Sequence, residues 1–185
     1  MSKKLTVRIR PSRLRMFAAV LVFATAPSPA ARSTHPVRLN FVCASPEALA
    51  RSQVQSVVRE LMSTRGEEGS RAWGDRAVAV DLNHDSHPEF LVPLSCGGTC
   101  NCTWGIVAEG PPRSLGVIEG CVLEFVWAKD NWISVSSYSH FSAYEGALTT
   151  YTYREGQYRR VSSDDLKPEA VARYEECKDN KSCCP

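Results

Sequence analysis

The sequence has no apolar run long enough to cross a membrane. The apolar stretch near its start, residues 16–26, is eleven residues long, whereas a membrane-spanning helix needs about 20. The sequence also lacks a nucleophile elbow, a zinc-hydrolase motif and a phosphate-binding loop. These absences argue against a membrane anchor and make an enzyme less expected than a non-catalytic protein.

The first thirty residues contain no acidic residue. They hold six basic residues, then the apolar stretch, then the small residues Ser28, Pro29 and Ala30. This order predicts a cleavable secretory signal over residues 1–30. The segment has no Arg-Arg pair, which favours the general export route over the twin-arginine route. We therefore expect a secreted or periplasmic protein whose mature chain starts near Ala31 and has no membrane span.

The expected mature chain has no excess of basic residues. The whole chain has 22 Lys and Arg against 20 Asp and Glu, and removing the six basic signal residues leaves 16 against 20, a net charge of −4. Nucleic-acid binding needs Lys and Arg clustered on one face. We therefore expect no nucleic-acid partner.

Cysteine is abundant in the mature chain. An even number in an exported chain predicts disulfides, and eight cysteines allow 105 pairings. We expect at least three bonds. Adjacent cysteines are poorly placed to bond each other, so either Cys183 or Cys184 is expected to tie the Cys-rich tail, residues 167–185, to the strands. The eight are Cys43, Cys96, Cys100, Cys102, Cys121, Cys177, Cys183 and Cys184.

Zinc is the alternative for three of these cysteines. Cys96, Cys100 and Cys102 could bind it with a histidine such as His84, His87 or His140. Their spacing is not a CxxC pair, and export favours oxidation, so disulfides are the stronger interpretation.

Residues 31–185 have the length of one domain. Residues 31–44 are interpreted as a polar leader that ends in a short apolar stretch. Ser45 suits a helix N-cap and Pro46 the first helical position, and the apolar residues that follow lie on one face, which predicts an amphipathic helix over residues 46–64. A short helix is expected over residues 168–177.

Between these helices the pattern is typical of strands. Short apolar or alternating segments are separated by turn residues such as Glu119-Gly120 and Glu155-Gly156. The expected fold is α+β: an antiparallel β-meander packed by the N-terminal helix, with a short C-terminal helix and disulfide staples. The predicted strands are residues 77–80, 90–94, 104–108, 114–118, 121–126, 132–139, 147–154 and 157–161.

The sharpest local signal is an acidic loop, which we define as residues 81–89. Oxygen-bearing side chains recur at its positions 1, 3, 5 and 9, namely Asp81, Asn83, Asp85 and Glu89. Such spacing lets a tight loop surround one hard cation, with the backbone carbonyl of His87 as a further ligand. The loop is not an EF-hand, because Ser86 and Val92 replace the Gly and Glu of that motif. A polar turn without metal is the alternative.

The acidic loop resembles the calcium loops of FG-GAP and VCBS-type repeats, which read DxNxDGxxD or DxNGDGxxE between two strands. Residues 132–135 and 151–158 also look like hairpins of small exported bacterial proteins of unknown function that carry one such loop. The resemblance implies Ca²⁺ as a structural cofactor. His84 and Ser86 stand where the family loops usually have glycine, and a single loop argues against the propellers that the repeats form.

The segment of residues 136–146 suggests an alternative function. It concentrates polar and aromatic residues in a connection, where His140 and Glu145 could act as the acid–base pair of a small secreted hydrolase. The first hypothesis remains a non-catalytic exported module that binds a protein or a glycan. The four tryptophans are expected in the core, with a sugar-binding face as the alternative.

Overall fold

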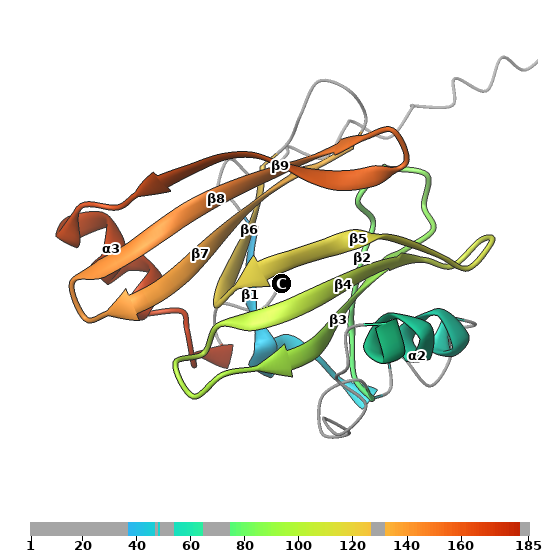
Figure 1. The fold of residues 1–185 in the computed structure, drawn as a ribbon, viewed down its shortest axis with the longest axis horizontal. Coiled ribbons are helices and arrows are strands. Elements are labelled where there is room, and N and C mark those ends of the chain that lie inside the picture. The colour runs from blue at the N-terminus through green and yellow to red at the C-terminus, as the bar shows by residue number, and fades with distance from the viewer. Residues whose placement is uncertain (1–36, 47, 49–53, 65–74, 127–131, 182–185) are drawn as a thin grey trace, which may run out of the picture. The chain divides into compact units, whose positions relative to one another are not determined.

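The computed structural model in Figure 1 describes residues 37–46, 48, 54–64, 75–126 and 132–181. The expected signal segment, Trp73, Trp127, Cys183 and Cys184 lie outside the described residues. In the described ranges, two antiparallel sheets and the helices α2 and α3 confirm the expected mixture of antiparallel strands with helices. In the described part of the chain, no helix combines the length and the apolarity needed to cross a membrane.

The first sheet has four strands that pair in chain order. All three pairings are antiparallel, and a register shift interrupts the β3–β4 ladder between Pro93 and Ser95. Proline has no N–H to donate, so an irregularity at this position fits its chemistry. The strands are β2 (Val78–Val80), β3 (Glu89–Cys96), β4 (Cys102–Ala108) and β5 (Arg113–Gly120).

The second sheet has five strands in the order β1-β6-β7-β8-β9. All its neighbours are antiparallel too. Strand β1 lies in the segment interpreted above as a leader, so this strand was not predicted. The strands are β1 (Val37–Asn40), β6 (Val122–Val126), β7 (Ser134–Ser142), β8 (Glu145–Arg154) and β9 (Gln157–Asp165).

The single meander expected from the sequence is divided after β5. Strands β5 and β6 belong to different sheets, and only Cys121 separates them. The corner needs the glycine that precedes it: Gly120 has φ +157°, and a Cβ there would collide with the Ser137 side chain and the Tyr138 carbonyl. The Cys121 amide donates to that Tyr138 carbonyl at 2.6 Å. Glu119-Gly120 is therefore a corner between sheets and not a hairpin turn.

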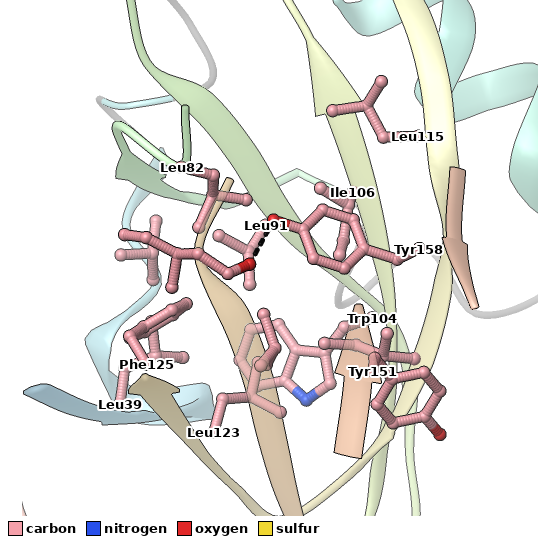
Figure 2. Packing of buried hydrophobic residues seen from close by; sticks show 14 of the residues in the cluster. Leu39, Leu82, Leu91, Trp104, Ile106, Leu115, Leu123, Phe125, Tyr151 and Tyr158 are labelled. Atoms are coloured by element: carbon pink, nitrogen blue, oxygen red, sulfur yellow. Dashed lines mark hydrogen bonds between the residues drawn. The ribbon is translucent and has the colours of Figure 1, made fainter. Parts of the chain in front are cut away.

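The main core cluster draws its buried side chains from both sheets. Leu91, Trp104 and Ile106 come from the four-stranded sheet, and Leu123 and Tyr158 from the five-stranded sheet (Figure 2). Two polar atoms in this core have main-chain partners. The Trp104 Nε1–H donates to the Gly120 carbonyl at 3.0 Å, and the Tyr158 hydroxyl donates to the Ile133 carbonyl at 2.9 Å.

Helix α2 (Gln55–Thr64) covers the second half of the helix predicted over residues 46–64. Of the first half, the structure describes only residues 46, 48 and 54. Ser45 Oγ accepts a hydrogen bond from the Ala48 amide at 3.4 Å, which fits its predicted N-cap role. A second buried cluster contains Val54 and Val58 together with side chains of β3 and β4. Figure 1 shows α2 beside β3 and β4.

Helix α3 (Pro168–Glu175) ends two residues before the predicted limit. Its Val171 and Tyr174 belong to a third buried cluster with Val122 and Tyr138 of the five-stranded sheet. The Tyr174 ring stacks on Tyr138 with 4.8 Å between centroids.

The chain segment after β1 forms a short 3-10 helix, η1 (Phe41–Cys43).

Disulfides staple one end of the four-stranded sheet. Cys96 bonds to Cys102 across the β3–β4 connection, and Cys100 bonds to Cys121 at the corner between the sheets. Cys43 and Cys177 are also disulfide-bonded, and none of the described cysteines is free. The zinc interpretation of Cys96, Cys100 and Cys102 is therefore wrong, because all three sulfurs are oxidised. The predicted bond of Cys183 or Cys184 lies outside the described residues.

Candidate functional site

The acidic loop connects β2 to β3 and is anchored in the core. Leu82 is fully buried in the main cluster (Figure 2), and its carbonyl accepts a hydrogen bond from the Ile133 amide at 2.7 Å. One apolar side chain thus fixes the start of the loop, while the residues on either side of it carry the polar groups. The loop emerges from two paired strands, because Val80 pairs with Glu89 in the β2–β3 ladder.

The backbone of the acidic loop is left-handed at two non-glycine positions. His84 has φ +61° and Ser86 has φ +69°. Non-glycine residues adopt this region at a cost, and they do so mainly where the surrounding structure demands it. The loop therefore takes the glycine-type path although the sequence places side chains there.

The first carboxylate of the loop has one oxygen without a partner. Asp81 Oδ2 accepts a hydrogen bond from the Ser86 amide at 3.1 Å. Its other oxygen, Oδ1, is buried and accepts no hydrogen bond from the described residues. A buried carboxylate oxygen is costly without a donor or a cation. The burial of Asp81 Oδ1 is therefore not compensated by a hydrogen-bond donor of the described residues.

Asp85 is held by the loop itself. Its Oδ1 accepts from the His87 amide at 2.8 Å, and its Oδ2 accepts from the Asn83 side-chain amide at 2.8 Å. These hydrogen bonds, that of the His87 amide first, lower the pKa of the Asp85 carboxyl below its usual value. Asp85 is therefore an anion at neutral pH, and about half of its side-chain surface is exposed.

Glu89 is the buried carboxylate of the loop. It is 3% exposed, and Oε2 accepts from the Leu82 amide at 2.8 Å. Burial raises the pKa of Glu89 to about 7; the bond from Leu82 opposes this rise, and the charges of Asp85 and Asp81 add to it. Three carboxylates thus lie close enough to repel one another, which a bound cation would relieve.

The predicted ligand set consists entirely of oxygen atoms. Four of the five residues, Asn83, Asp85, His87 and Glu89, line one cavity of about 360 Å³, and Asp81 directs its carboxylate to the Ser86 amide of the same loop. Oxygen donors of this kind suit a hard cation such as Ca²⁺. Within the described ranges, no group of three or more His, Cys, Asp or Glu side chains is arranged to hold a metal ion. The three carboxylates of the predicted set, Asp81, Asp85 and Glu89, are therefore not gathered around one point in this structure, and a cation would have to draw them together.

A second polar cluster surrounds His140. Its Nδ1 lies 2.6 Å from Glu175 Oε1 at the end of α3. The same carboxylate accepts from the Tyr138 hydroxyl at 2.7 Å and from Lys178 Nζ at 2.8 Å. Asn101 brackets the His140 backbone, accepting from its N–H at 2.9 Å and donating to its carbonyl at 2.7 Å.

The carboxylate that contacts His140 is therefore Glu175 and not Glu145. In the β7–β8 hairpin Glu145 is paired with Ser142 and accepts from its hydroxyl at 3.3 Å. His140 also lines a cavity of about 270 Å³ together with Phe41, Thr99 and Lys178. Sequence spacing could not reveal the Glu175 contact, because 35 residues separate it from His140 and no motif links them.

No family model, curated protein or solved structure matches this chain.

Proposed function

We propose that the chain is an exported, non-catalytic binding module that one Ca²⁺ in the acidic loop stabilises, acting in the periplasm or outside the cell on a protein or glycan partner. The observation that carries the proposal is the buried Asp81 Oδ1, which lacks a donor beside two further carboxylates. The left-handed backbone at His84 and Ser86 supports it, because the calcium loops that this sequence resembles usually have glycine at these positions. The disulfides support an oxidising compartment, and with it the signal segment.

In this proposal the metal has a structural role. Ca²⁺ would be held by the side chains of Asp81, Asn83, Asp85 and Glu89 and the carbonyl of His87. The loop joins two paired strands, so fixing it would hold β2 and β3 in register. Helix α2 is proposed to cover the outer face of the same sheet through Val54 and Val58.

The calcium proposal predicts a higher melting temperature in Ca²⁺ than in chelator. Extracellular calcium sites bind with Kd on the order of 10⁻⁴ to 10⁻³ M. At ten times Kd, binding to the folded state alone adds about 1.4 kcal/mol, or about 3 to 6 °C for a domain of this size. Asp85→Ala should abolish this shift, and because Asp85 is half exposed the variant should still fold. The measurement is thermal unfolding in 10 mM CaCl₂ and in EDTA.

The matched control is Asp164→Ala, which removes an exposed carboxylate on β9. This variant should keep the full calcium-dependent shift. Equal melting temperatures of the wild-type protein in calcium and in chelator would show that the acidic loop is a bare turn.

The His140 cluster supports a second candidate, a small hydrolase. The observation in its favour is the contact of His140 Nδ1 with Glu175 beside a cavity, since a carboxylate on one ring nitrogen is how catalytic histidines are oriented. Against it, Glu175 also accepts hydrogen bonds from Tyr138 and Lys178, and the bond from Tyr138 joins the end of α3 to the five-stranded sheet. We therefore expect this cluster to have a structural role, holding the end of α3 against the sheet, and we call it the latch.

The latch predicts that Glu175→Gln lowers the free energy of unfolding by about 1 to 3 kcal/mol at pH 7, because the variant loses charge-assisted hydrogen bonds. Burial opposes ionisation of Glu175, but hydrogen bonds from Lys178, Tyr138 and His140 outweigh it and lower its pKa. A lowered folded-state pKa stabilises the protein above about pH 4.5, and this contribution is lost as the pH falls further. Urea unfolding between pH 3 and pH 7 should show a smaller pH dependence in the variant.

Glu176→Gln is the control. The Glu176 side chain is next to Glu175 in the sequence but is exposed, so the unfolding curve of this variant should match that of the wild type. An unchanged free energy of unfolding in Glu175→Gln would contradict the latch. The hydrolase candidate would replace it if ester or glycoside substrates were turned over by the wild type and not by a folded His140→Ala variant.

A further inference from the structure

The cavity beside the acidic loop has the size and composition of a small-ligand site. Its volume is about 360 Å³, within the range of about 300 to 1,000 Å³ that such sites occupy. The loop contributes Asp85 and Glu89 to its wall, and the connection after β4 contributes Glu109. Arg113, the first residue of β5, and the aromatic side chain of Trp132 also line it. Three carboxylates, from two segments of the chain, thus line the cavity, while Arg113 is the one Lys or Arg among its described lining residues and Trp132 supplies an apolar surface.

A cation in the loop would retain open coordination positions. Ca²⁺ takes six to eight oxygen ligands, and the proposed set supplies about five if each residue gives one oxygen. Four of the five ligand residues line this cavity. Oxygen atoms of a bound molecule could therefore complete the coordination sphere from the cavity side, as vicinal hydroxyls and carboxylates do.

Arg113 provides positive charge that forms no ion pair with a carboxylate of the described residues. Its guanidinium donates to the Gly156 carbonyl and to the Tyr153 hydroxyl, both at 3.3 Å. These partners are neutral, the bonds are long, and no Asp or Glu among the described residues forms an ion pair with Arg113. Arginine binds carboxylates through two parallel hydrogen bonds, so this side chain selects for an acidic ligand.

Trp132 supplies a fixed aromatic surface in the same cavity. Its ring stacks on Tyr153 with 3.7 Å between centroids and meets Tyr158 edge-on at 6.2 Å. These contacts hold the indole in one orientation while the residue still lines the cavity. An immobilised indole offers an apolar face to the C–H groups of a sugar ring at little cost in side-chain entropy.

We infer that this cavity binds a hexuronate-type saccharide: Arg113 takes the carboxylate, Trp132 packs against the sugar ring, and ring hydroxyls complete the coordination of the cation. The inference rests on the calcium-binding role proposed above and names the glycan class of that role. A neutral sugar would leave the Arg113 guanidinium without an acidic partner, and removal of the cation would leave the acidic loop repelling the ligand's carboxylate.

The test uses galacturonate and galactose, which differ only in the carboxylate at C6. The exported chain, labelled with ¹⁵N, is titrated with each sugar in 10 mM CaCl₂ and in EDTA, and the indole N–H signal of Trp132 is followed, assigned by its loss in Trp132→Phe. We expect galacturonate in calcium to bind at least about tenfold more tightly than galactose, and EDTA to weaken it by a similar factor.

Arg113→Gln should weaken galacturonate binding about tenfold and leave galactose binding unchanged. The matched control is Arg159→Gln, which alters an exposed arginine of β9 outside the cavity. Because Arg113 is exposed, its variant should melt at the wild-type temperature, which thermal unfolding verifies.

A calcium titration without sugar separates the two proposals. If the loop amides shift with Ca²⁺ but galacturonate moves no signal, the ligand inference is wrong and calcium binding stands. If Ca²⁺ moves no signal, both are wrong. Equal affinity for the two sugars, or equal galacturonate affinity in calcium and EDTA, overturns the acidic, cation-bridged site even though calcium binds.

Discussion

Replacing Cys100 and Cys121 together with alanine is expected to lower the free energy of unfolding by about 3 kcal/mol. The bond closes a loop with a sequence separation of 21, and the chain-entropy model assigns about 3 kcal/mol to a loop of this length. It also joins the β3–β4 connection to the corner where the chain changes sheets. The measurement is urea unfolding of the double variant and the wild type, both under non-reducing conditions.

The Cys96–Cys102 pair gives the matched comparison. Its sequence separation is only 6, so the same model assigns it about 2 kcal/mol. Replacing this pair with alanine should therefore cost about 1 kcal/mol less than replacing Cys100 and Cys121. A larger loss from the shorter loop would show that native contacts around the bonds outweigh the entropy of the unfolded chain.

Replacing Trp104 with alanine is expected to cost about 3 to 5 kcal/mol, the range for removing a large aromatic side chain from a core. Trp104 is 0% exposed and lies in the cluster between the two sheets. The whole free energy of unfolding of a domain is about 5 to 15 kcal/mol, so this variant should lie near the limit of folding. Urea unfolding measures the loss, followed by backbone circular dichroism because its signal does not depend on Trp104.

Trp104→Phe separates the volume effect from the hydrogen-bond effect. Phenylalanine fills much of the space but removes the Nε1–H donor of the Gly120 carbonyl. We expect a smaller loss, about 1 to 3 kcal/mol, from the buried carbonyl left without a partner. A loss below about 1 kcal/mol in Trp104→Ala would mean that the sheets close over the vacated space, contrary to the packing described.

The strands were largely predictable because their signals are local. Alternating residues and turn chemistry predicted eight strands, β2 to β9, to within about four residues at each end, and the Glu155-Gly156 turn does join β8 to β9. Two features were missed. Strand β1 is four residues long and pairs with β6, whose residues lie more than 80 positions later. Glu119-Gly120 was interpreted as a turn within one meander, because the same turn residues suit both a hairpin and a change of sheet.

The candidate sites show the same division between local and distant signals. The oxygen spacing of the acidic loop is a short-range pattern, so the sequence brought together the residues that line the cavity there. The other residues of that cavity include Arg113, the first residue of β5, and Trp132, just before β7, and neither carries a motif. For His140, the carboxylate predicted from sequence proximity is not the one in contact. Glu145 pairs with Ser142 in the β7–β8 hairpin, and Glu175 at the end of α3 contacts His140.

The position of β1 has a consequence for the order in which the molecule assembles. A ribosome delivers the N-terminal strand first, yet its ladder partner β6 and the Cys177 carbonyl that accepts from Asn40 Nδ2 follow much later, the latter 137 residues on. Residues 78–120, by contrast, contain a complete four-stranded sheet of sequential hairpins. That sheet can form before β6, the strand that pairs with β1, is in place. Because non-local pairings of this kind slow folding, closure of β1 onto β6 is expected among the last events, and until then Cys43 beside it is exposed to incorrect oxidation.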